Sequence, residues 1–271
     1  MQGKKEKKIF GSAQRVVLDA FTGEGEDSHI RYEIVDYRRK SAPWKNMRSI
    51  EFFNNGRYIY STVYLSERRH FQPLYPMAQK TVDEYYKLSP PKTALVLGCA
   101  GCSIPRFLVL HYKDCIVTGI EYSKQFESIA RRYFISSSMT SRFRLIRGDA
   151  FRFVPDAVGK QQYDYIHTDI YTGDAIHPMV FSQDYVQSVY SILSQGGLAM
   201  FNAFRVPAEK LDSVIDSVKA PFGGLYVLDM YRKYFVAMLK TSDAAKLRDF
   251  EEHLPKDVEI RHKKIQTDFL P

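Results

Sequence analysis

A stretch near the middle of the chain, residues 93–121, constrains the fold more than any other. It reads TALVLGCAGCSIPRFLVLHYKDCIVTGIE. The apolar run 94–97 is typical of a strand that is buried on both faces. Ser103 is a good N-cap residue, and Pro105 is tolerated in a first helical turn, where its missing N–H has no intrahelical partner. The stretch therefore predicts a strand, a tight turn, a helix and a second strand that ends in an acid.

The turn and the acid together predict a nucleoside site. Small residues let the backbone approach a ligand closely, and the helix N-terminus offers free N–H groups. Glu121 can accept both hydroxyls of a ribose. It follows Gly98 by 23 residues (121 − 98), close to the spacing of about 20 that is typical of a nucleoside-binding βαβ unit. The alternative is a βαβ unit without a ligand, in which the glycines serve only packing.

Strands and helices alternate after this unit. Strands are expected at 143–147, 163–168, 198–202, 226–230 and 234–239, and helices at 183–193, 208–219 and 242–253. This alternation predicts an α/β fold with a Rossmann-like, doubly wound, mostly parallel sheet. Before the unit, Asn-Gly between two β-rich runs predicts a hairpin. We expect four parts: a polar tail (1–28), a small antiparallel β domain (29–75), the Rossmann-like domain (76–255) and a second polar tail (256–271).

Composition narrows the class of protein. The net charge is +8 with a pI near 9.2, which permits anionic partners, but no nucleic-acid-binding motif stands out and we expect no nucleic-acid partner. No apolar run approaches the roughly 20 residues that span a bilayer, and the charged N-terminus is not a secretory signal, so a cytoplasmic location is expected. Cys99 and Cys102 form a CxxC pair, which without further ligands favours small-residue packing over a metal or redox site.

The carboxyl ends of the predicted parallel strands carry the chemistry. In order, they end at the small-residue loop and then at the acids Glu121, Asp149 and Asp169. Ligands of doubly wound sheets bind outside these ends. The layout predicts the loop beside the charged tail of a ligand, Glu121 on the ribose, Asp149 near the adenine and Asp169 near the reacting group.

This layout resembles the class I S-adenosylmethionine-dependent transferases, and among them the spermidine synthases, which are polyamine aminopropyltransferases. Three stretches carry the resemblance: 147–153 (RGDAFRF), 163–169 (YDYIHTD), and 181–185 (FSQDY) followed by Gly196-Gly197. The resemblance implies a seven-stranded sheet of the methyltransferase type, a homodimer, and Asp169 as the catalytic base. It implies S-adenosylmethionine or its decarboxylated form as group donor and no metal.

The chain departs from the spermidine synthase pattern where that family holds a diamine. Gly101 stands where the family has the Asp that holds the donor amine. The family's Asp-Gly-x-x-Gln hairpin has become Asn55-Gly56-Arg57-Tyr58-Ile59, and its Asp-Ser-Ser-Asp-Pro segment has become Asp169-Ile170-Tyr171-Thr172-Gly173-Asp174. The nucleoside half of the site is thus retained, and the polyamine half is altered.

We therefore expect a transferase that moves a methyl or aminopropyl group to a small-molecule acceptor, for which the resemblance suggests an amine. The expected catalytic residues are Asp169, Tyr171 and Asp174. The expected donor-binding residues are Gly98, Cys99, Ala100, Gly101, Glu121, Tyr122, Asp149, Ala150 and Asp169. Two alternatives stay open: a non-catalytic homologue that binds a nucleoside or acts through protein contacts, and an NAD-dependent oxidoreductase, which the missing GxGxxG disfavours.

Overall fold

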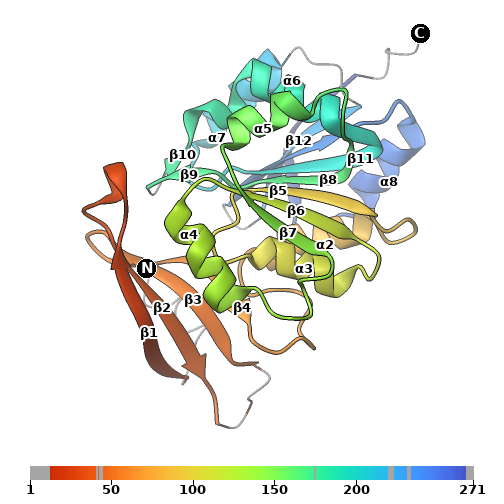
Figure 1. Ribbon diagram of the computed structural model, residues 1–271. Coiled ribbons are helices and arrows are strands. Elements are labelled where there is room, and N and C mark those ends of the chain that lie inside the picture. Colours follow the sequence, from red (N-terminus) through yellow and green to blue (C-terminus); the bar gives the residue numbers. More distant parts are fainter. Residues whose placement is uncertain are drawn as a thin grey trace.

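A computed structural model describes residues 13–40, 42, 45–173, 175–218, 223–230 and 233–266. The chain forms two main β-sheets, a four-stranded antiparallel sheet from its N-terminal part and an eight-stranded sheet that is covered by helices on both faces (Figure 1). A two-stranded hairpin, β9 (Tyr171–Thr172) with β10 (Ala175–Ile176), forms a third, small sheet. None of the helices within the described residues is both long and apolar enough to cross a bilayer.

The N-terminal sheet is a meander of β1 (Gln14–Thr22), β2 (Arg31–Arg38), β3 (Met47–Phe53) and β4 (Arg57–Tyr64). The predicted hairpin at Asn55-Gly56 joins β3 to β4, and Asn55 takes the left-handed conformation that such turns need. Residues 14–22 were expected in a polar tail, and that expectation is wrong. They lack a clean apolar alternation because β1 is an edge strand with largely half-buried or exposed side chains.

The central sheet has the order β14-β12-β13-β11-β8-β5-β6-β7. Its strands are β5 (Thr93–Leu97), β6 (Ile116–Glu121), β7 (Phe143–Arg147), β8 (Tyr163–Thr168), β11 (Leu193–Asn202), β12 (Gly224–Asp229), β13 (Tyr234–Leu239) and β14 (Glu259–Ile265). β13 and β14 run opposite to the other six, so the sheet is mostly parallel as predicted. The expected count of seven is wrong, because β14 adds an edge strand where a polar tail was expected.

Helices cover both faces of this sheet, and each face has its own apolar core. On one face pack α2 (Pro76–Tyr85), α3 (Ser103–His111), α4 (Lys124–Ile129) and α8 (Ala244–Glu252). On the other face pack α5 (Ala150–Ala157), α6 (Gln183–Ile192) and α7 (Ala208–Ser217). Short helical turns η1 (Gly25–Asp27), η3 (Ala130–Phe134) and η4 (Pro178–Phe181) complete the elements. This is the doubly wound arrangement that the sequence predicts.

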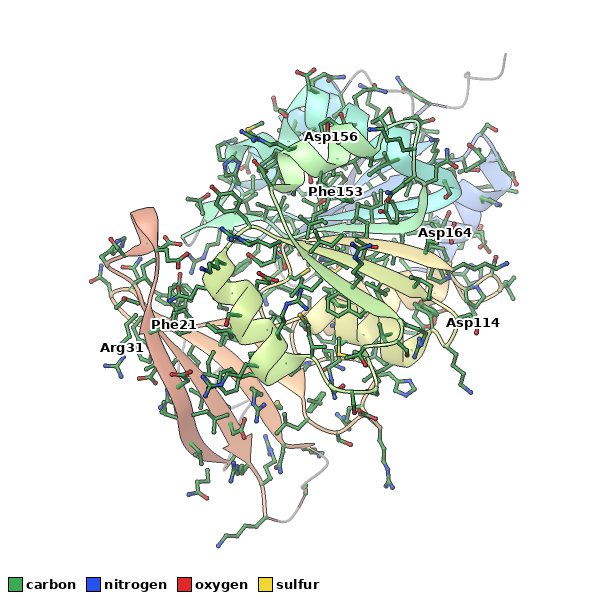
Figure 2. The ribbon with its side chains drawn as sticks, in the orientation of Figure 1. Phe21, Arg31, Asp114, Phe153, Asp156 and Asp164 are labelled. Carbon is green, nitrogen blue, oxygen red and sulfur yellow. The ribbon has the colours of Figure 1, made fainter. Side chains whose placement is uncertain are left out.

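An aromatic cluster fixes the N-terminal sheet against α4. Phe126 of α4 meets Tyr32 edge to face at 5.3 Å between ring centroids and stacks on Tyr60 at 5.1 Å. Phe21 of β1 joins them, 5.9 Å from Phe126. Figure 2 shows Phe21 on the side of the sheet that is turned toward α4, with Arg31 on the outer side. The N-terminal sheet is therefore held close to the ends of β5 and β6.

Two tyrosines at the end of α2 bind an irregular part of β11. The pairing of β11 with β8 shifts register between Leu193 and Leu198. The Tyr85 hydroxyl donates to the Gly196 carbonyl at 2.9 Å, and the Tyr86 hydroxyl accepts from the Leu198 N–H at 3.1 Å while donating to the carbonyl of Asp164. The backbone groups that the bulge leaves unpaired are thus bonded by side chains from α2.

Candidate functional site

A cavity of about 680 Å³ opens at the carboxyl ends of β5, β6, β7 and β8 and is closed on one side by β4. Its position is the one expected for a ligand site in a doubly wound sheet, and its volume is typical of a small-molecule site. The cavity is lined by the strand-end residues Gly98, Cys99, Ala100, Glu121, Tyr122, Gly148, Asp149, Ala150 and Asp169, together with residues of the N-terminal sheet and of the loops that follow β8 and β11.

The loop after β5 depends on glycine at its first position. Gly98 has φ +84°, and a Cβ there would lie 2.2 Å from the carbonyl oxygen of Asp169. The backbone at Asp169 cannot easily shift away from the added Cβ, because the Asp169 N–H donates to the Leu97 carbonyl at 2.8 Å. The predicted N-cap at Ser103 is wrong: Cys102, in the left-handed region at φ +56°, is the cap residue, and Ser103 is the first helical residue. The helix therefore begins one residue earlier than a Ser103 cap would place it, and no side chain caps it.

The Glu121 carboxylate binds the backbone of the loop after β5. One of its carboxylate oxygens accepts the N–H groups of Cys99 (3.1 Å) and Ala100 (2.9 Å), and the other accepts the N–H of Ser123 (3.0 Å). Burial raises the pKa of Glu121, although these backbone N–H groups favour its charged form. The carboxylate is thus fixed in orientation at the end of β6, and the residue is 8% exposed. Tyr122, beside it, also lines the cavity and is largely exposed.

Asp149 closes the cavity at the end of β7. It is the N-cap of α5, where its carboxylate accepts the N–H of Phe151 at 2.8 Å. Ala150 and Phe151 add an apolar surface beside it. The Phe151 ring lies 4.6 Å from the ring of His177, which also lines the cavity. An acid and a flat apolar wall thus lie side by side here.

Asp169 follows the last residue of β8 and lines the cavity. Burial raises the pKa of Asp169 to about 6, and the hydrogen bond from Asn202 opposes that shift. The Asn202 amide nitrogen donates to the Asp169 carboxylate at 2.7 Å, and its amide oxygen accepts the Phe204 N–H at 2.9 Å. The second bond fixes which end of the amide faces Asp169. A carboxylate with a pKa near 6 is a stronger base than an exposed one.

The hairpin β9–β10 follows Asp169 along the chain, and its residues Tyr171 and Thr172 line the same cavity. Tyr171 of β9 lines the cavity, and its hydroxyl is buried without a hydrogen-bond partner among the described residues. Burial, and then the charge of Asp169, raises the pKa of Tyr171. Asp174, the third expected catalytic residue, lies outside the described residues. The structure thus brings Tyr171 to Asp169 and leaves the place of Asp174 a prediction.

Gly101, expected to bind the donor, is not part of the cavity lining. A Cβ at this position would lie 2.7 Å from the Ser61 hydroxyl oxygen and 3.0 Å from a ring carbon of Phe134. A serine of β4 therefore packs where a longer side chain would have to pass. The neighbouring cysteines are free and buried, and burial raises the pKa of Cys99 and of Cys102. Thiols of this kind are packing groups and poor nucleophiles.

Sequence patterns missed the far end of the cavity. Tyr60 of β4, Tyr75 before α2, Arg205 after β11 and Lys233 before β13 all line it. Tyr75 takes a left-handed conformation at φ +53°, which is uncommon for a bulky residue and often marks a functional site. The altered hairpin pointed to Arg57 and Tyr58, because it stands where the spermidine synthases have the Asp-Gly-x-x-Gln motif. No local motif links the other segments to the cavity.

Two curated proteins resemble parts of this chain in sequence. No family model matches the chain. The eEF1A lysine and N-terminal methyltransferase of Mus musculus is 28% identical over 148 residues, which are 52% of this chain and 21% of that protein. The polyamine aminopropyltransferase of Vibrio vulnificus is 26% identical over 137 residues, which are 50% of this chain and 45% of that protein. The chain spans less than half the length of either curated relative.

Solved structures share the fold. A probable spermidine synthase from Corynebacterium glutamicum has a TM-score of 0.60 and 16% identity, over 93% of this chain and 99% of that chain. Human methyltransferase-like protein 13 in complex with SAH has a TM-score of 0.53 and 22% identity, over 66% of this chain and 87% of that chain. The predicted fold class and the resemblance to spermidine synthase-like proteins are confirmed, and the relatives named here are transferases.

Proposed function

We propose that the chain is a group transferase that takes intact S-adenosylmethionine as its methyl donor. One observation carries the proposal: the loop at Gly98 and the acids Glu121, Asp149 and Asp169 line a single cavity. We assign Glu121 to the ribose of the donor, Asp149 to its adenine and Asp169 to the reacting centre, in the order in which the strands end. The similarity to a methyltransferase and to a polyamine aminopropyltransferase supports the same class of donor.

The nucleoside half of the cavity fits such a donor. Glu121 accepts three N–H groups, which leaves one of the roughly four lone-pair sites of its carboxylate for a ribose hydroxyl. Asp149 is placed to accept from an exocyclic amine, and Ile120 and Phe151 supply apolar surface for a purine ring. All the residues that we assign to the adenine therefore already line the cavity.

The tail half favours the intact donor over the decarboxylated one. The first residues of α3, Ser103, Ile104 and Pro105, line the cavity. The Ser103 hydroxyl is buried and has no hydrogen-bond partner among the described residues. A helix N-terminus with a spare hydroxyl suits a carboxylate, which only intact S-adenosylmethionine carries. Gly101 offers no acid for a lone amine, and Ser61 packs against the space such an acid would need.

The chain's own residues then have distinct tasks. When bound, the donor supplies an electrophilic methyl carbon, and the C–S bonding pair stays on sulfur when that carbon is transferred. Asp169 accepts the proton of the attacking O–H or N–H group, and Asn202 holds the carboxylate in place. Tyr171, Thr172 and Gly173 of the hairpin line the cavity next to Asp169, and we assign to them the exclusion of water from the reacting centre. Positioning and proton removal are the two contributions expected of the protein.

Calorimetric titration with S-adenosylmethionine and with its decarboxylated form, side by side, tests the donor. The proposal expects saturable binding with preference for the intact form. Ser103→Ala should reduce that preference, because it removes the hydroxyl that we assign to the carboxylate. Ser188→Ala is the control, since this serine sits on α6 and its hydroxyl donates to the Asp184 carbonyl, away from the cavity lining.

The outcomes separate the candidates. Binding of the decarboxylated form alone would replace methyl transfer by aminopropyl transfer, the second candidate, which the polyamine aminopropyltransferase relative favours. Binding of neither form would reject the transferase reading and promote the non-catalytic alternative. If Ser103→Ala kept the same preference for the intact donor, the serine would not bind the donor carboxylate. The loop backbone would then have to account for the preference.

A further inference from the structure

His177 stands between β10 and η4 and lines the cavity. It is the N-cap residue of η4, and its backbone N–H donates to the Ile170 carbonyl at 3.0 Å. Ile170 directly follows Asp169. The backbone that carries His177 is therefore tied to the chain just beyond the end of β8, and the side chain starts from a fixed position.

The imidazole of His177 has one ring nitrogen bonded to the protein. Its Nδ1 accepts the Met179 N–H at 3.2 Å. A nitrogen that accepts a hydrogen bond carries no proton, so the neutral ring has its proton on Nε2. Nε2 has no hydrogen-bond partner among the described residues. Its N–H group can therefore donate to a ligand in the cavity.

Phe151 places this imidazole at the end of the cavity that we assign to the purine. The ring centroids of Phe151 and His177 lie 4.6 Å apart. On the backbone side, the Phe151 N–H donates to one oxygen of the Asp149 carboxylate at 2.8 Å. The nearest charged group to the other oxygen is the exposed Arg152, at 3.9 Å. A carboxylate that accepts and an imidazole that donates thus stand on either side of Phe151.

We infer that His177 binds the purine of the S-adenosyl donor by donating from Nε2 to a ring nitrogen. The inference rests on the proposed function and adds a residue that determines which base is bound. In adenine the exocyclic amine donates, and the ring nitrogens on either side of it, N1 and N7, accept. Asp149 accepts from the amine, and His177 donates to one of these two nitrogens. A 6-oxopurine turns a carbonyl oxygen toward Asp149 and is disfavoured.

Calorimetry with four ligands tests this pair of contacts. S-adenosylhomocysteine is the reference, its 1-deaza and 7-deaza analogues each replace one ring nitrogen by C–H, and S-inosylhomocysteine carries the 6-oxo group. One deaza analogue should bind at least about tenfold more weakly than the reference, because the His177 N–H loses its partner. The affected analogue identifies the ring nitrogen. S-inosylhomocysteine should bind about a hundredfold more weakly, since two carbonyl-type oxygens then face each other at Asp149.

His177→Phe assigns the contact to its residue. The variant keeps an aromatic ring at this position and removes the N–H, so the affected analogue and S-adenosylhomocysteine should bind it equally, within about twofold. A histidine that serves only as the cap of η4 would weaken both ligands alike and leave their ratio at its native value. His253→Phe is the matched control, because this histidine is exposed at the end of α8 and outside the lining. Thermal unfolding of both variants checks that the fold is retained.

The inference and the proposed function fail in different ways. If S-adenosylhomocysteine binds and both deaza analogues bind as tightly, His177 makes no hydrogen bond to the purine, and the transferase proposal stands. A native ratio that persists in His177→Phe assigns the ring nitrogen to another group and refutes the inference equally. If S-adenosylhomocysteine itself does not bind, the proposed function fails, and the inference fails with it.

Discussion

Replacing Gly98 by alanine should destabilise the protein in two ways, by forcing a left-handed conformation on a residue with a Cβ and by overpacking the Asp169 carbonyl. Gly98 has φ +84°, and its added Cβ would lie 2.2 Å from the Asp169 carbonyl oxygen and 2.8 Å from the carbonyl carbon. The left-handed conformation costs about 1–2 kcal/mol for a residue with a Cβ. Overpacking adds about 1–3 kcal/mol. The expected loss in free energy of unfolding is therefore roughly 2–5 kcal/mol.

Gly159→Ala is the matched control. Gly159 has φ +74°, and a Cβ there would meet no atom within 4 Å. It should lose only the conformational part, about 1–2 kcal/mol. The difference between the two variants measures the contact between the loop after β5 and the end of β8. Urea unfolding with an unchanged m-value gives both numbers on one scale.

The result that would refute this reasoning is an equal loss in both variants. It would mean that the loop after β5 and the carbonyl of Asp169 do not approach each other as described. A second readout is the affinity for S-adenosylmethionine, which should fall in Gly98→Ala and stay unchanged in Gly159→Ala. Retained affinity together with a large stability loss would make the contact structural only.

Three further predictions concern acids and thiols. Asp169→Asn should lower turnover at least about a hundredfold while donor binding largely survives; in the native protein the rate should rise with pH through about 6, because the deprotonated form is the base. A flat pH–rate profile between 5 and 8 would exclude Asp169 as that base. Asp164→Ala should cost about 1–3 kcal/mol in thermal unfolding, since its carboxylate accepts from two backbone N–H groups and a hydroxyl. Exposed Asp114, labelled with Asp164 in Figure 2, is the control, and equal effects would contradict the bonding. Cys99 and Cys102 should resist iodoacetamide at pH 8 until the protein unfolds, whereas rapid labelling of the folded protein would show that they are accessible.

The sequence predicted which residues meet at the strand ends of the cavity, because that part of the cavity is local. Gly98 and Glu121 belong to one βαβ unit, and strand ends of a parallel sheet meet at one edge whatever lies between them. Asp149 and Asp169 follow from the same rule. Each of these residues could be placed from the period of the apolar runs and from the turn residues that end them.

The far end of the cavity could not be predicted, because no single segment encodes it. Tyr75, Arg205 and Lys233 come together only when the N-terminal sheet packs beside the loops after β11 and β12. The edge strands β1 and β14 were missed for a different reason. β14 alternates between exposed and half-buried residues and reads EIRHKKI, so its sequence looks like a solvated tail. Ser103 was misassigned because its loop bends through a left-handed Cys102.

The hydroxyl contacts of Tyr85 and Tyr86 determine how the protein can be dissected. They join α2 to residues that lie 111 and 112 positions away along the chain, at the irregular part of β11. Bonds over such separations require the closure of a long loop, which costs chain entropy. A fragment that begins at the Ser89-Pro90-Pro91 connector would leave the Leu198 N–H and the Gly196 carbonyl of the sheet without these partners. The smallest unit expected to fold cooperatively therefore begins before α2, so that the helix and the sheet unfold in one transition.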